Sequence, residues 1–171
     1  DGFFDLRSRP KSVAIVGGGY ISVELAGILQ ALGSEVGVFA QKSRLLKTFD
    51  HDITDMLAEN CRQAGIKLHF DVDIARAEAL AGDSIALHDK NGQRSETFDC
   101  LIWATGRRSN SDDLGLDRAG VAVDEKGHVI VDEFQRTNVE GICAICDVTG
   151  RIALTPVAIA PGRRVMDRLF G

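Results

Sequence analysis

The stretch Ser12-Val-Ala-Ile-Val-Gly-Gly-Gly-Tyr-Ile-Ser-Val-Glu24 decides the fold of this 171-residue chain. A short, mostly β-branched run leads into Gly17, Gly18 and Gly19, and a helical pattern of apolar residues follows at once. A strand, a glycine turn and a helix N-terminus in this order bind a dinucleotide pyrophosphate. We expect Gly17 to permit the tight turn and Gly19 to let the backbone approach the phosphates without a Cβ in the way. Ser22 takes the third small-residue position of the motif.

The pattern beyond the turn predicts an α/β fold: a Rossmann-like three-layer domain with a parallel sheet and an antiparallel β-meander as its crossover. We expect parallel strands at residues 12–16, 35–40 and 66–70, and helices at 20–32 and 53–63, the second capped by Asp50. Short alternating segments at 74–79, 84–90 and 94–98 predict the meander. The apolar run 100–104 predicts a strand in the middle of the sheet, covered on both faces.

The last third of the chain is expected to hold a small hairpin over residues 121–131, a buried strand at 142–145 and a helix at 156–169 interrupted by Pro161-Gly162. Cys143 and Cys146 form a C-x-x-C sequence at that strand. A redox pair of this kind needs its first thiol at a helix N-terminus, so we favour neither redox use nor a metal site for these cysteines.

Composition limits the classes of function. The chain is 44% hydrophobic and 26% charged, with a formal net charge of −5, which gives no reason to expect nucleic acid or an anionic membrane as a partner. The apolar stretch 13–33 holds Glu24, Gln30 and several glycines, which argues against a membrane span. The first residues resemble no signal peptide and no initiator Met is present. We therefore expect a cytoplasmic protein of which this chain is a part.

The end of the second strand carries the signal for nucleotide choice. A strand that binds the ribose 2′-hydroxyl of NADH ends in Asp or Glu, whereas this one ends in Ala40-Gln41. The cations Lys42, Arg44 and Lys47 follow, and positive charge favours a 2′-phosphate. We expect NADPH, with NADH as the alternative if the loop is merely a basic surface.

Several segments together resemble one family. They are Asp1-Gly-Phe-Phe4, residues 17–27, Leu46-Lys-Thr-Phe-Asp50, Cys100-Leu-Ile-Trp-Ala-Thr-Gly-Arg107, Gly127-His-Val-Ile-Val-Asp-Glu-Phe-Gln135, Thr137-Asn-Val-Glu-Gly141 and Leu154-Thr-Pro-Val-Ala-Ile-Ala160. These segments, and the order in which they follow one another, are similar to those of the glutathione reductase-like group of the FAD-dependent pyridine nucleotide–disulfide oxidoreductases. The resemblance implies a lead-in from a flavin domain at residues 1–10, an inserted NAD(P)H-binding domain at 11–137 and a return to the flavin domain at 138–171.

The resemblance also implies roles for individual residues. Tyr20 matches a tyrosine that covers the flavin and moves aside for the nicotinamide, and Glu24 matches a buried glutamate near the nicotinamide. Without the resemblance, each would be read as an exposed residue near the start of a helix. The remaining matches to cofactor-binding positions are Gly17, Gly18, Gly19, Ile21, Gln41, Lys42, Lys47, Gly106, Arg107, Asp147 and Thr155, with FAD as the partner of the last two.

The chain departs from the family pattern at positions that are expected to contact the cofactors. Gln41 and Lys47 stand where NADPH-using relatives have arginines, and Cys146 replaces a glycine that packs against FAD. The family's redox disulfide and first flavin motif lie outside this sequence, so the fragment alone is not expected to turn over. The implied activity is NADPH-dependent reduction of glutathione disulfide through FAD, in a homodimer concerned with cell redox homeostasis. An NADH-linked dihydrolipoamide or glutathione-amide type of enzyme and a non-catalytic nucleotide-binding module remain alternatives.

Overall fold

The computed structural model describes residues 2–171, which form two compact units, one ending at Gly106 and one spanning Arg107–Gly171. The first unit begins with a short 3-10 turn, η1 (Gly2–Asp5), and continues through β1 (Ser12–Val16), α1 (Tyr20–Ala31), β2 (Glu35–Phe39), α2 (His51–Gln63) and β3 (Lys67–His69). Four more strands complete it: β4 (Ile74–Ala79), β5 (Ile85–Asp89), β6 (Arg94–Phe98) and β7 (Cys100–Trp103).

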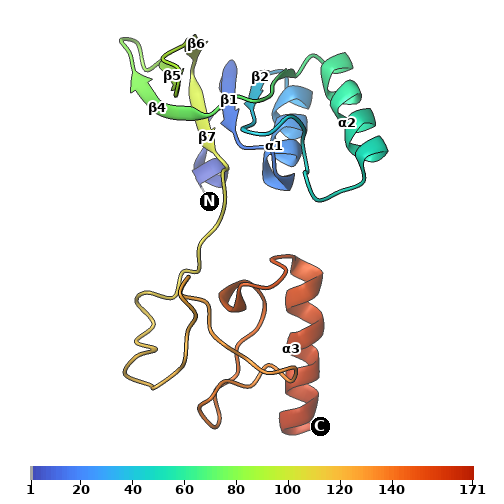
Figure 1. Ribbon diagram of the computed structural model, residues 1–171, viewed down its shortest axis with the longest axis vertical. Helices are drawn as coiled ribbons and strands as arrows, with labels where there is room; N and C mark the ends of the chain where they lie inside the picture. The colour runs from blue at the N-terminus through green and yellow to red at the C-terminus, as the bar shows by residue number, and fades with distance from the viewer. Residues whose placement is uncertain (1) are drawn as a thin grey trace. The chain divides into compact units, whose positions relative to one another are not determined.

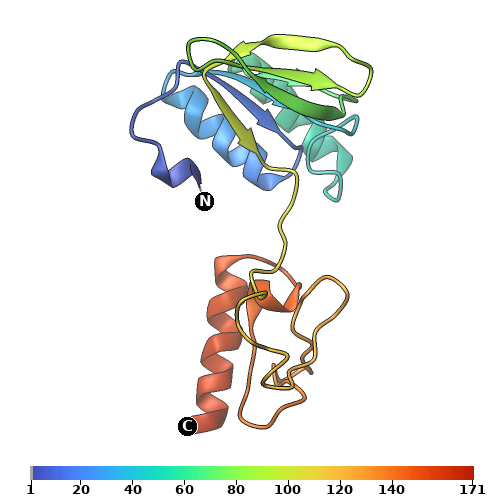
Figure 2. The same ribbon diagram turned by 90° about the vertical axis from the view of Figure 1, so that its left-hand side faces the viewer.

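The first unit has three layers, as predicted. The parallel sheet runs in the order β3-β2-β1-β7, and β4, β5 and β6 form a separate antiparallel sheet. Helices α1 and α2 cover one face of the parallel sheet and the meander covers the other (Figures 1 and 2). Alternate residues of β1 therefore enter two different cores: Val13 and Ile15 pack on the helix side, and Ala14 and Val16 on the meander side.

The local signals for the two helices of this unit are confirmed. Helix α1 ends before Gly33, whose φ of +88° is the left-handed conformation that terminates helices. Helix α2 begins after Asp50, whose side chain accepts hydrogen bonds from the N–H groups of Asp52 and Ile53 at 3.0 and 3.4 Å. Two otherwise unpaired N–H groups of the first turn are thereby satisfied.

The position expected for β7 is wrong. Within residues 2–171, β7 pairs only with β1 and lies at the edge of the sheet, and Trp103 is 51% exposed. The strand in the middle is β1, which pairs with both β2 and β7 and is almost completely buried. An apolar sequence favours a strand, but it does not fix the number of neighbours that the strand will have.

The second unit, Arg107–Gly171, holds less regular structure than predicted. Residues 142–145 do not form a strand. The hydroxyl of Thr137 donates to the carbonyl of Ile142 and accepts from the N–H of Val139, and these hydrogen bonds close a tight turn. A single bridge, between Arg136 and Cys143, remains of the expected pairing. The hairpin over 121–131 is likewise reduced to one bridge, between Val123 and Val129, around the expected turn.

Two helical segments complete this unit, η2 (Cys146–Thr149) and α3 (Thr155–Phe170). Helix α3 runs through Pro161, so the predicted interruption is wrong. A proline removes one backbone donor, and here the turns on either side keep the helix continuous. Across residues 2–171, no helix combines the length and the apolar composition needed to cross a bilayer.

Candidate functional site

The glycine turn is held between the ends of two strands. The N–H of Gly17 donates to the carbonyl of Phe39 at 2.9 Å, and its φ is +133°. A Cβ on Gly17 would lie 2.3 Å from the carbonyl oxygen of Ala104, which follows β7. Both the backbone conformation and the close approach therefore require glycine at this position.

Gly18 and Gly19 differ in what surrounds them. A Cβ on Gly18 would lie 3.2 Å from the Cβ of Ala40, whereas a Cβ on Gly19 would meet no atom within 4 Å. Gly19 is the N-cap of α1 and, having no side chain, leaves the first turn without a side-chain cap. The open space at Gly19 thus lies where the positive end of the helix dipole faces outward, which fits the phosphates of a nucleotide.

The first residues of α1 divide into buried and exposed positions. Ser22 is completely buried, and its Oγ has no hydrogen-bond partner in the part of the chain that the structure describes. It lies against the turn, 3.0 Å from the position of a Cβ on Gly17, so a larger residue would displace the glycines. Tyr20 is 40% exposed and Ile21 half-buried. Glu24 is exposed, so the burial that the resemblance implies for it is not present in residues 2–171.

The basic loop lies beside the glycine turn. The N–H of Leu46 donates to the carbonyl of Gly18 at 2.8 Å, and the side chain of Leu45 is buried in the helix-side core. These two contacts bring the loop and the turn together. Lys42 and Lys47 are exposed, and neither forms an ion pair with another described residue.

Two side chains of the loop already have partners. Gln41 donates from Nε2 to Asp73 Oδ2 at 3.0 Å, and Arg44 Nη2 lies 3.8 Å from Asp55 Oδ1. Hydrogen bonds from Lys90 and Gln41 lower the pKa of Asp73, so a carboxylate neutralised by Lys90 stands next to the loop. Asp73 could not be predicted from its local sequence, because its approach to Gln41 depends on how the chain leaves β3.

The second unit places the remaining candidates around η2. Arg107 Nη2 lies 3.7 Å from Asp147 Oδ2, and Cys146 donates from Sγ to Asp147 Oδ1 at 2.8 Å. Thr155 is exposed at the start of α3. Gly106, the last candidate, does not belong to this unit: it is exposed and ends the first one. Both carboxylate oxygens of Asp147 thus have partners within the chain, so a ligand that bonds to this carboxylate would have to share it with Arg107 or Cys146.

Cys146 begins η2 and does not lie in a strand. Its φ of +56° is a conformation that glycine adopts without strain, which agrees with the glycine expected at this position from the family pattern. The hydrogen bond to Asp147 raises the pKa of its thiol, which therefore stays protonated at neutral pH. A protonated thiol is a poor nucleophile, so Cys146 itself is not activated in this environment.

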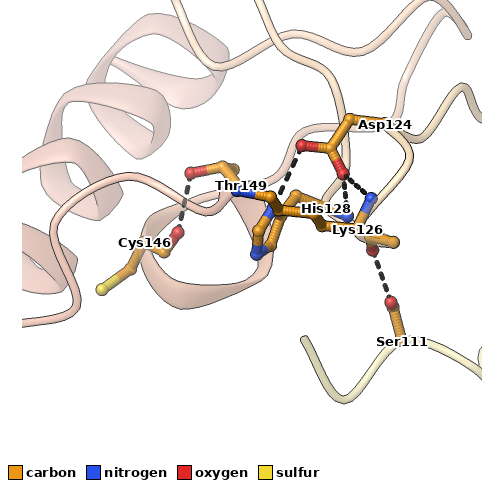
Figure 3. Close-up of polar contacts among 7 residues, drawn as sticks. Ser111, Asp124, Lys126, His128, Cys146 and Thr149 are labelled. Atoms are coloured by element: carbon orange, nitrogen blue, oxygen red, sulfur yellow. Dashed lines mark hydrogen bonds and ion pairs between the residues drawn. The ribbon is translucent and has the colours of Figure 1, made fainter. Parts of the chain in front are cut away.

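A turn beside η2 fixes its position (Figure 3). The carboxylate of Asp124 accepts from the backbone N–H groups of Lys126 and His128 and lies 3.0 Å from His128 Nδ1. The imidazole of His128 in turn packs on Gly150, where a Cβ would lie 2.4 Å from Nδ1. Within η2, Thr149 donates to the carbonyl of Cys146 at 2.7 Å, as Figure 3 shows.

Comparison with known proteins agrees with this arrangement. The family described as pyridine nucleotide-disulphide oxidoreductase matches residues 1–162. A glutathione reductase of Schizosaccharomyces pombe is 44% identical over 172 residues, which cover 100% of this chain and 37% of the relative. The chain thus spans little more than a third of that protein.

Solved structures show the same fold. The HOCl-induced flavoprotein disulfide reductase RclA of Escherichia coli is 31% identical with a TM-score of 0.91, over 99% of this chain and 38% of RclA. LpdA of Mycobacterium tuberculosis is 27% identical with a TM-score of 0.87, over 98% of this chain and 36% of LpdA. With its strand, glycine turn and helix in the expected geometry, the chain belongs to the pyridine nucleotide-disulphide oxidoreductase family.

Proposed function

We propose that this chain is the pyridine-nucleotide-binding portion of a flavoprotein disulfide reductase that reduces glutathione disulfide. One observation carries the proposal: the glycine turn leaves open space at Gly19, directly before the N-terminus of α1. The glutathione reductase of S. pombe, 44% identical, supports the choice of substrate. In this proposal residues 11–137 hold the nucleotide and 138–171 belong to the flavin-binding part.

The chain's own residues bind and orient the nucleotide. Gly17, Gly18 and Gly19 shape the turn, and backbone N–H groups of the first turn of α1 face the phosphates. Bound NADPH supplies the hydride for the flavin of the whole protein. Tyr20 would act as a gate for the nicotinamide, and Glu24 would contact the nicotinamide end. Ile21 would touch the nucleotide, and Gly106 and Arg107 would belong to a loop that contacts the cofactor. Asp147 and Thr155 would contact FAD.

The loop after β2 is proposed to select NADPH. Lys42 and Lys47 offer unpaired positive charge beside the turn, and the negative charge of Asp73 is matched by Lys90. A charged hydrogen bond contributes about 1.5–3 kcal/mol, less the cost of desolvation, so one such contact should favour NADPH about tenfold. Because the groups are exposed, the preference should shrink as salt rises.

Calorimetric titration of the 171-residue chain with NADPH and NADH tests the proposal. We expect tighter binding of NADPH at low salt, a stronger preference in Gln41→Arg, and weaker NADPH binding with unchanged NADH binding in Lys47→Glu. Gly19→Ala should lose both nucleotides, because a methyl group would fill the open space. Absence of nucleotide binding by the unmodified chain would refute the proposal.

The substrate is tested on the full-length protein. We expect NADPH-dependent reduction of glutathione disulfide by a cytoplasmic homodimer. NADH-driven turnover of lipoamide or glutathione-amide disulfide would instead favour the NADH-linked alternative. Nucleotide binding without reduction of any disulfide would favour a non-catalytic module.

A further inference from the structure

A cavity of about 380 Å³ lies on the meander side of the parallel sheet. Phe39 and His69, neighbours at the ends of β2 and β3, form one wall with rings stacked 4.5 Å apart and 7° from parallel. Val72, Ile74 and Leu87 add further apolar surface. The volume is that of pockets that hold small organic molecules. The opposite side of the lining is polar and consists of Asp89, Gln93, Arg94, Ser95 and Glu96.

One charge at this cavity has no counter-ion. Asp89 lines it, and its Oδ1 accepts hydrogen bonds from the N–H groups of Asn91 and Gln93 at 2.9 and 2.7 Å, which fix the side chain in the β5–β6 turn. No described residue forms an ion pair with Asp89. An ionised carboxylate next to apolar walls attracts a cation more strongly than one in open water.

The other charged groups of the lining are compensated. Glu96 binds Lys67 Nζ at 2.9 Å, and Arg94 Nε lies 4.0 Å from Glu78 Oε2. Burial lowers the pKa of His69, so its ring is neutral at pH 7 and adds no positive charge to the wall. The net charge that a ligand meets at the cavity is therefore negative and comes from Asp89.

We propose that this cavity binds a small organic cation, an amine attached to a single apolar ring, with the ring against the partly exposed side chains of Val72 and Ile74 and the ammonium at Asp89. The lining includes no residue of the glycine turn or the basic loop, but the backbone of Phe39 accepts from Gly17 and that of Val72 donates to Ala40, so the cavity is distinct from the nucleotide site and adjoins it. A neutral ligand of the same shape would gain the apolar contacts alone, and an anion would be repelled.

Three probes of nearly equal size test the proposal: benzylamine, benzyl alcohol and benzoate, each titrated into the 171-residue chain and followed by ¹H–¹⁵N NMR. We expect amide shifts at Val72, Leu87 and Asp89, and binding of benzylamine about three- to tenfold tighter than that of benzyl alcohol, with benzoate weakest. Saturating NADPH should not displace the probes, because no residue of the glycine turn or the basic loop lines the cavity. Equal binding of the three probes, shifts centred on the glycine turn, or no binding would overturn the proposal.

The variant Asp89→Asn removes the charge and keeps an oxygen that can accept from the turn amides. It should bind benzylamine and benzyl alcohol equally. Asp83→Asn is the matched control, because Asp83 is an exposed aspartate in the other turn of the meander, with a φ of +57° that Asn tolerates well. It should keep the preference of the unmodified chain. A second measurement needs no variant: 0.5 M NaCl should reduce the affinity for benzylamine and leave that for benzyl alcohol unchanged.

Discussion

Replacing Gly17 by alanine should destabilise the first unit far more than the same change at Gly19. At position 17 the backbone has φ +133°, which costs a residue with a side chain about 1–3 kcal/mol. The new methyl group would also lie 2.3 Å from the carbonyl oxygen of Ala104, and moving the end of β7 away costs about 1–3 kcal/mol more. The free energy of unfolding should therefore fall by about 2–6 kcal/mol.

At position 19 neither cost arises. Gly19 has φ −86° and ψ 179°, which any residue adopts, and the methyl group meets no atom within 4 Å. Alanine is a poorer N-cap than glycine, so we expect a loss below about 1 kcal/mol. Urea unfolding monitored by circular dichroism measures both variants against the unmodified chain. If Gly17→Ala unfolds at the same urea concentration as Gly19→Ala, the reasoning about the turn is wrong.

Three further changes test other parts of the structure. Asp50→Ala should cost about 1 kcal/mol of unfolding free energy through loss of the α2 cap, and a change below 0.3 kcal/mol by urea unfolding would contradict the role of the cap. The backbone of Cys146 is in the left-handed conformation, so Cys146→Gly should be more stable than Cys146→Val by about 1–3 kcal/mol. Equal urea midpoints of the two variants would show that the backbone there is unstrained. Burial holds the pKa of His69 below its ordinary value of about 6.5, so the stability from the neutral ring is complete above that pH and lost as the pH falls through the lowered pKa. The melting temperature should accordingly fall less between pH 7 and 5.5 in His69→Phe than in the exposed-site control His51→Gln, and parallel pH profiles would exclude His69 as the cause.

The features that were predicted correctly have short-range causes. The glycine turn, the cap at Asp50 and the end of α1 at Gly33 each depend on the conformations open to one or two residues. The meander followed from alternation within segments of five or six residues. The basic loop could be placed beside the turn because the second strand of a βαβ unit lies next to the first.

The features that were missed depend on distant neighbours. The exposure of Trp103 is set by which strands flank β7, and the absence of a strand at 142–145 by hydrogen bonds of Thr137. The partnership of Gln41 with Asp73 joins residues 32 positions apart, and nothing in either local sequence marks it. The cavity below the meander arises from the packing of one sheet on another, which no single segment encodes.

The way the basic loop is attached has a consequence for the evolution of this fold. Its attachment uses a backbone N–H of Leu46, the carbonyl of Gly18 and one buried leucine, while Lys42 and Lys47 extend into solvent. Mutations that alter the charges can therefore accumulate without disturbing the scaffold that carries them. Substitutions at positions 42 and 47 should consequently need few compensating changes elsewhere in the first unit, whereas a change at position 41 also breaks the hydrogen bond of Gln41 to Asp73.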